Sequence, residues 1–91
     1  MRRINWTNRI ASATDLQDEY IPGLPLIEIA GNIRVLIENH CGVTEYGKQR
    51  IVAQTKVNLV AVEGEDLELT KMTAEQLIIS GRIFSVEFLG R

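Results

Sequence analysis

Hydrophobic and polar residues alternate along most of the chain, but the period of the alternation changes near residue 20. Before that point apolar residues recur at three- and four-residue spacing, as on one face of a helix. These residues are Trp6, Ile10, Ala13 and Leu16. The segment Ile21-Pro22-Gly23-Leu24-Pro25 then ends any helix, because prolines cannot continue one. We therefore expect an N-terminal helical segment and linker over residues 1–23 and a β domain over residues 24–91.

From Leu26 onward the period is two, which is typical of strands with one buried face. Leu26–Ala30 and Ile33–Glu38 flank the pair Gly31-Asn32, whose residues tolerate positive φ, so they predict a β-hairpin. Residues 39–48 read as the longest irregular connection. Further strands are expected over residues 50–55, 57–63, 67–70, 77–80 and 83–89, separated by turns at 63–66 and 73–75 and by a break at Gly81.

The pattern predicts a mainly β fold, a single small antiparallel domain of about six to seven short strands. A meander, a roll and a sandwich all remain open. Gly47, Gly64 and Gly81 are evenly spaced, which suits a weak repeat but is more typical of a meander with turns at equal intervals. The segment 57–63 is apolar on both sides, so it is expected to be a central strand or to lie at an interface through Val60 and Val62.

Composition narrows the functional classes. A chain of 91 residues has a thin core, and self-association would cover more apolar surface, so we expect a homo-oligomer. The net charge of −2 argues against a nucleic-acid partner. The single cysteine, Cys41, fits a reducing compartment. No apolar signal-peptide run follows Arg2 and Arg3, and we expect a cytoplasmic protein.

The segment Ile37-Glu38-Asn39-His40-Cys41-Gly42 is the densest polar cluster in the chain. The favoured interpretation is structural: Asn39 and His40 bond to the backbone at a strand end, and Gly42 adopts a turn conformation. Adjacent residues of a strand point to opposite faces, so His40 and Cys41 are badly placed for nucleophilic catalysis. We expect no enzyme activity and no cofactor. The alternative is a small-ligand or metal-binding regulatory domain that uses His40, Cys41 and nearby carboxylates across a subunit boundary.

Two charged segments have simple interpretations. The acidic residues Glu63, Glu65, Asp66 and Glu68 are expected to form a solvated edge that discourages aggregation. Trp6 lies among arginines, which suits an anionic membrane surface but suits packing against the sheet better. The candidate interaction residues are Asn39, His40, Tyr46, Val60, Val62 and Trp6.

Residues 24–90 resemble the YabP/YqfC family of sporulation proteins, and its YqfC branch in particular. The most specific element is Ile37-Glu38-Asn39-His40-x-Gly42 at its spacing from Leu24-Pro25-x-Ile27-x-Ile29-x-Gly31. Weaker elements are Gly64-x-x-Leu67, Met72 and Leu77-x-Ile79-x-Gly81-x-Ile83.

The resemblance implies a role in endospore formation in Firmicutes, in the mother cell, with no catalytic residues to carry over. It also implies a membrane-associated sporulation protein of the YqfD type as a partner. Together with the residue pattern, it leads to the hypothesis of a non-enzymatic binding and assembly module, localised in the cytoplasm or held at the membrane by its partner.

Overall fold

The computed structural model describes residues 23–90, and in this part of the chain it contains strands but no helix. All strands belong to one antiparallel sheet with the order β1-β2-β6-β5-β4-β3. The strands are β1 (Leu26–Ala30), β2 (Arg34–Glu38), β3 (His40–Tyr46), β4 (Arg50–Thr55), β5 (Leu59–Met72) and β6 (Gln76–Leu89). The expected single antiparallel β fold is confirmed. The N-terminal helical segment, with Trp6, lies outside the described residues.

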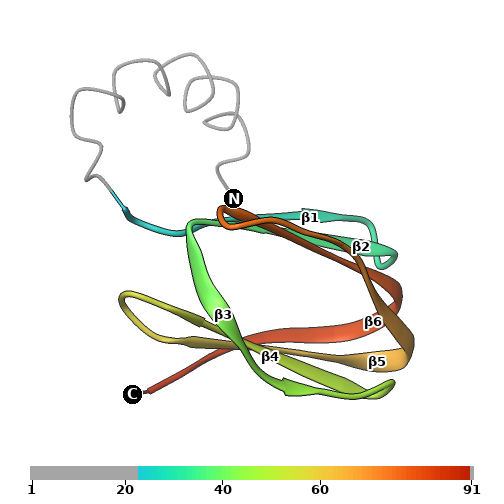
Figure 1. The fold of residues 1–91 in the computed structure, drawn as a ribbon. Helices are drawn as coiled ribbons and strands as arrows, with labels where there is room; N and C mark the ends of the chain where they lie inside the picture. The colour runs from blue at the N-terminus through green and yellow to red at the C-terminus, as the bar shows by residue number, and fades with distance from the viewer. Residues whose placement is uncertain (1–22, 91) are drawn as a thin grey trace, which may run out of the picture.

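The sheet folds over on itself because its two central strands are long and bent. β5 and β6 have 14 residues each and pair with one another along both halves. The first half of β5 pairs with β4, and the first half of β6 pairs with β2. Figure 1 shows the result: β1 and β2 lie over the layer that contains β4, and β5 and β6 bend from one layer to the other. β3 to β6 follow one another as in a meander.

The hydrophobic core lies between the two layers. Its residues come from every strand except β1 and β3, and they sit on the faces that the alternation predicts for β2 and β4. They are Val35, Ile37, Ile51, Ala53, Val60, Val62, Leu67, Leu77, Ile79 and Ile83. Val60 and Val62 have no exposed surface, because β5 is a central strand. Their proposed role as interaction residues is therefore corrected: they pack inside the domain.

The bend in β5 and β6 corrects the expectation of a turn at residues 63–66 and a break at Gly81. Both strands continue through these positions, with register shifts near Gly64. A Cβ at Gly64 would lie 1.9 Å from the carbonyl oxygen of Arg82, and one at Gly81 would lie 2.7 Å from that of Asp66. Gly81 also has a φ of 145°. Glycine is required at this crossing because two backbones approach too closely for a side chain.

The acidic residues of this region lie on a central strand, so they do not form a sheet edge as expected. Glu63 accepts a 2.7 Å hydrogen bond from Arg50, and Glu65 is paired with Arg82. The guanidinium group of Arg82 also lies 5.8 Å from the ring centre of Phe84. Exposed pairs of this kind contribute little to stability, so the glycines rather than the charges define the bend.

Two connections differ from the expected ones. Residues 40–46 form β3 rather than an irregular loop. The sequence pattern missed this strand because register shifts between His40 and Val43 and between Val43 and Glu45 interrupt its alternation. The β1–β2 hairpin is confirmed, but its connection also includes Ile33. The amide of Ile33 donates to the carbonyl of Ala30 at 3.1 Å, and its own carbonyl accepts from the amide of Gly81. This turn is therefore held against the bend.

The close approach at Gly64 leads to a stability prediction. We expect Gly64→Ala to lower the free energy of unfolding by about 3 kcal/mol, because the new methyl group displaces the β6 backbone. Urea denaturation of the purified chain measures this. Gly47→Ala is the matched control: its Cβ would lie 3.5 Å from the carbonyl oxygen of Arg50, which is an ordinary contact. Equal unfolding free energies for the two variants would contradict the proposed packing.

Candidate functional site

His40 is the best-connected polar side chain at the start of β3. His40 as a whole is only 9% exposed. The backbone amide of Gly42 donates to its Nδ1 at 2.9 Å, and its Nε2 lies 2.8 Å from the carbonyl oxygen of Thr73. Because an amide can only donate and a carbonyl can only accept, the ring is the neutral tautomer with its proton on Nε2. His40 thus joins the start of β3 to the β5–β6 turn.

Asn39 holds the neighbouring part of the chain. It has a φ of 64°, a left-handed conformation that asparagine tolerates better than most residues. Its backbone amide donates to the carbonyl of Glu75 at 2.7 Å, and its side-chain amide donates to the carbonyl of Leu24 at 3.0 Å. The chain therefore turns sharply between β2 and β3 while remaining tied to the segment before β1 and to the β5–β6 turn. We call residues 39–42 the corner.

The β4–β5 turn lies next to the corner, because His40 pairs with Thr55 in the sheet. Thr55 has no exposed surface. Its hydroxyl bonds to the carbonyl and the side chain of Asn58, at 2.9 and 3.0 Å, and accepts from the amide of Val57. Gly23, the first described residue, also lies at this turn: a Cβ at Gly23 would lie 2.8 Å from Nζ of Lys56. We call this end of the molecule, with both turns, the open end (Figure 1).

Several exposed apolar side chains lie at the open end, and the sequence pattern predicted no interaction role for them. They are Leu24 (38% exposed), Val57 (54%), Met72 (52%) and Phe88 (64%), and we call them the apolar rim. Val57 lies in the β4–β5 turn, Met72 precedes the β5–β6 turn, and Phe88 pairs with Val60 beside the end of the core. Large exposed apolar groups near one another are typical of interaction surfaces.

The structure does not bring all the predicted interaction residues together. Asn39 and His40 lie at the open end, where they bond to the backbone. Tyr46 lies at the other end of β3 and is 61% exposed. Val60 and Val62 are in the core, and Trp6 is outside the described residues. Both ring nitrogens of His40 already contact protein atoms, and within residues 23–90 no three Cys, His, Asp or Glu side chains are grouped as a metal site.

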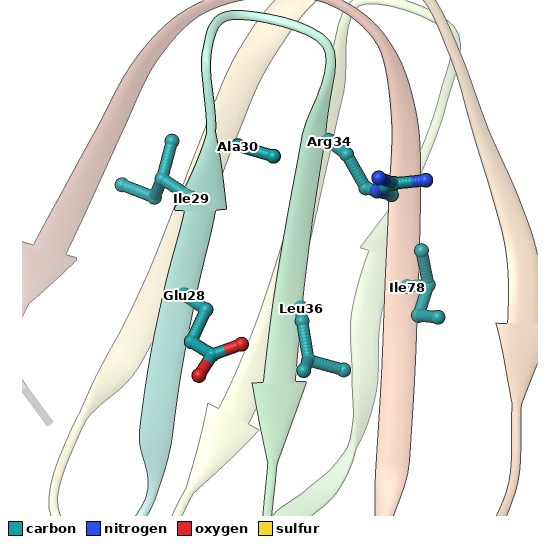
Figure 2. Close-up of a pocket in the computed structure, with 6 residues that line it drawn as sticks. All are labelled: Glu28, Ile29, Ala30, Arg34, Leu36 and Ile78. Atoms are coloured by element: carbon teal, nitrogen blue, oxygen red, sulfur yellow. The ribbon is translucent and has the colours of Figure 1, made fainter.

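A shallow depression lies on the outer face of β1, β2 and β6. Its volume is about 460 Å³, and Figure 2 shows its lining: Glu28, Ile29, Ala30, Arg34, Leu36 and Ile78. Ala30 pairs with Arg34, and Glu28 pairs with Leu36, so these four side chains share one face. The small side chain of Ala30 leaves the depression open toward the edge of the sheet.

Comparison with known proteins gives a family for this chain. The sequence model of the YabP family matches residues 25–91. The chain belongs to the YabP family. The resemblance to the YabP/YqfC family as a whole is thereby confirmed, and YabP family membership indicates a sporulation-related protein. No curated protein and no solved structure matches the chain.

The most specific residues of the YabP-family resemblance are those of the corner. Asn39 and His40 tie the start of β3 to the segment before β1 and to the β5–β6 turn, and Gly42, with a φ of 120°, brings its amide to His40. Within the described residues no helix is long and apolar enough to cross a membrane. In this YabP-family chain, therefore, the motif shapes the end of the domain that carries the apolar rim.

The contacts of His40 predict its effect on stability. We expect His40→Ala to lower the free energy of unfolding by about 2 kcal/mol, because the amide of Gly42 and the carbonyl of Thr73 both lose a partner in a partly buried site. Cys41→Ala, an exposed neighbour on the same strand, is the control and should change it by less than about 0.5 kcal/mol. Urea denaturation compares them. Two variants of equal stability would show that the ring does not hold the corner.

Proposed function

We propose that this chain is a non-enzymatic binding and assembly module of endospore formation. The observation that carries the proposal is the apolar rim, which lies directly beside the corner formed by the most specific residues of the family resemblance. Exposed apolar groups of this size cost free energy in water unless a partner covers them. The engagement of both His40 nitrogens with backbone groups supports a structural role for the corner.

The partner that fits the apolar rim presents an apolar surface of its own. A membrane-associated sporulation protein of the YqfD type, which the family resemblance suggests, is the natural candidate. The place of action is then the mother-cell cytoplasm, at the membrane that holds the partner. Val57, Met72 and Phe88 are the residues expected to contact it, because each is more than half exposed at the open end.

The proposal is tested by exchanging apolar rim residues in sporulating cells. We expect Phe88→Ser with Val57→Ser to lower the yield of heat-resistant spores by about tenfold or more, because losing about 1.4 kcal/mol of binding weakens a complex tenfold. Co-purification of the YqfD-type protein with the full chain should fall in parallel. Immunoblotting checks that each variant accumulates normally.

Phe84→Ser is the matched control, because Phe84 is 63% exposed but lies three residues after Gly81, next to the bend and away from the open end. It should leave spore yield and co-purification unchanged. Normal sporulation of the Phe88 and Val57 variant, at normal protein levels, would remove the apolar rim from the proposal. Normal sporulation of a deletion strain would remove the proposed function itself.

A further inference from the structure

The two edges of the sheet differ in regularity. On β3, two register shifts and the φ of 120° at Gly42 distort the edge. Such bulges hinder the addition of another strand. β1 pairs with β2 through five successive residues without a shift, and within residues 23–90 no strand lies on its other side. A regular, uncovered edge is where strand addition takes place.

The side chains of β1 also lack the usual protection of an edge. Glu28 is the only charged residue among its five. Ile29 lies on the core-facing side, opposite Val35, yet is 54% exposed, and Leu26 is 48% exposed. Figure 2 shows Ile29 projecting on the free side of β1, away from β2. Natural edges of this kind usually carry lysines, prolines or bulges, so an uncovered apolar edge points to a partner.

We propose that β1 is a dimerisation surface, at which a second copy of this chain pairs antiparallel about a twofold axis at Ile29. The two sheets then form one continuous sheet across the interface. This inference rests on the proposed binding function and deepens it by naming a second copy as one partner. It uses the edge at the other end of the sheet order from the bulged β3 edge. The rim residues Val57, Met72 and Phe88 lie on other segments and stay out of the interface.

Several registers keep the core-facing side chains of both copies on the same face of the joined sheet. The sequence of β1 favours the one with its axis at Ile29. An axis at Glu28 places two carboxylates directly opposite one another, which is destabilising. An axis at Ile27 places Pro25 opposite Ile29, and proline has no amide to donate to the ladder. An axis at Ile29 places the two Ile29 side chains opposite one another and Glu28 opposite Ala30 of the second copy.

Charge complementarity supports the same register. Within residues 23–90 neither Glu28 nor Arg34 is in an ion pair. With the axis at Ile29, Glu28 of the second copy lies beside Ala30, and Arg34 lies on the other side of Ala30. Two strand spacings, about 10 Å, separate the backbones of Glu28 and Arg34. Their long side chains can meet over the small Ala30, in the depression of Figure 2.

The first test measures association of the purified full chain by sedimentation velocity over a wide range of concentrations. A monomer–dimer equilibrium is expected. Glu28→Arg and Arg34→Glu should each raise the dissociation constant about tenfold or more, since two symmetry-related pairs become repulsive. The double variant with both changes should restore it. A chain that stays monomeric throughout, or a dimer that neither single variant weakens, would overturn the proposal.

The second test fixes the register by cross-linking. In a Cys41→Ser background, Ile29→Cys should give a covalent dimer on oxidation, because directly opposite residues of an antiparallel pair lie within disulfide range. Ile27→Cys in the same background should not, because Ile27 then faces Gly31 of the second copy. Faster cross-linking of the Ile27 variant would refute the register proposed here.

Two controls keep the outcomes distinct. Thr44→Lys places a charge on the β3 edge and should leave the dissociation constant unchanged; a loss of the dimer in this variant would assign association to the wrong edge. Urea unfolding checks that every variant is folded. The dimer is measured in purified protein and the proposed function in spores with apolar rim variants, so failure of one leaves the other result standing.

Discussion

The close approach of two backbones at Gly64 and Gly81 is the constraint on which the rest of this structure depends. A six-stranded sheet of this size has two faces, and a flat sheet would leave one apolar face in water. Bending β5 and β6 at the crossing places Val60 and Val62 of one layer opposite the other layer, so that one sheet encloses its own core. A side chain at the crossing would hold the strands apart and open the core, which is why small size matters there more than turn propensity.

The corner connects the two layers at the open end, as the crossing of β5 and β6 connects them at the opposite end. β2 and β3 are consecutive in the chain but lie at opposite sides of the sheet order, so the chain must pass from one layer to the other in very few residues. Asn39 accepts the left-handed backbone, and His40 uses both ring nitrogens to hold the passage against the β5–β6 turn. The most specific residues of the family resemblance are thus explained by chain geometry. In the proposed function, the apolar rim around them makes the contacts with a partner.

The alternation of apolar residues was enough to predict β1, β2 and β4, and β1 and β4 have the expected bounds. It failed where backbone geometry departs from regular pleating. Gly64 and Gly81 read as turns because a bend and a turn use the same residues, and only contact with another segment separates the two. β3 was missed because its bulges break the period of two. The structural role of Asn39 and His40 followed from their residue types. The apolar rim depends on which turns and strand ends the fold brings to one end of the molecule, and local pattern does not encode this.

The difference between the two sheet edges limits how many copies a shared sheet can contain. A protein with two regular edges can join head to tail, and such contacts propagate into filaments when the rotation between neighbours does not close. Here the bulges of β3 leave a single edge fit for pairing. Growth of the proposed dimer through further strands would therefore stop at a closed pair, and the irregularity that concealed β3 in the sequence would keep this small β protein from fibrous polymerisation.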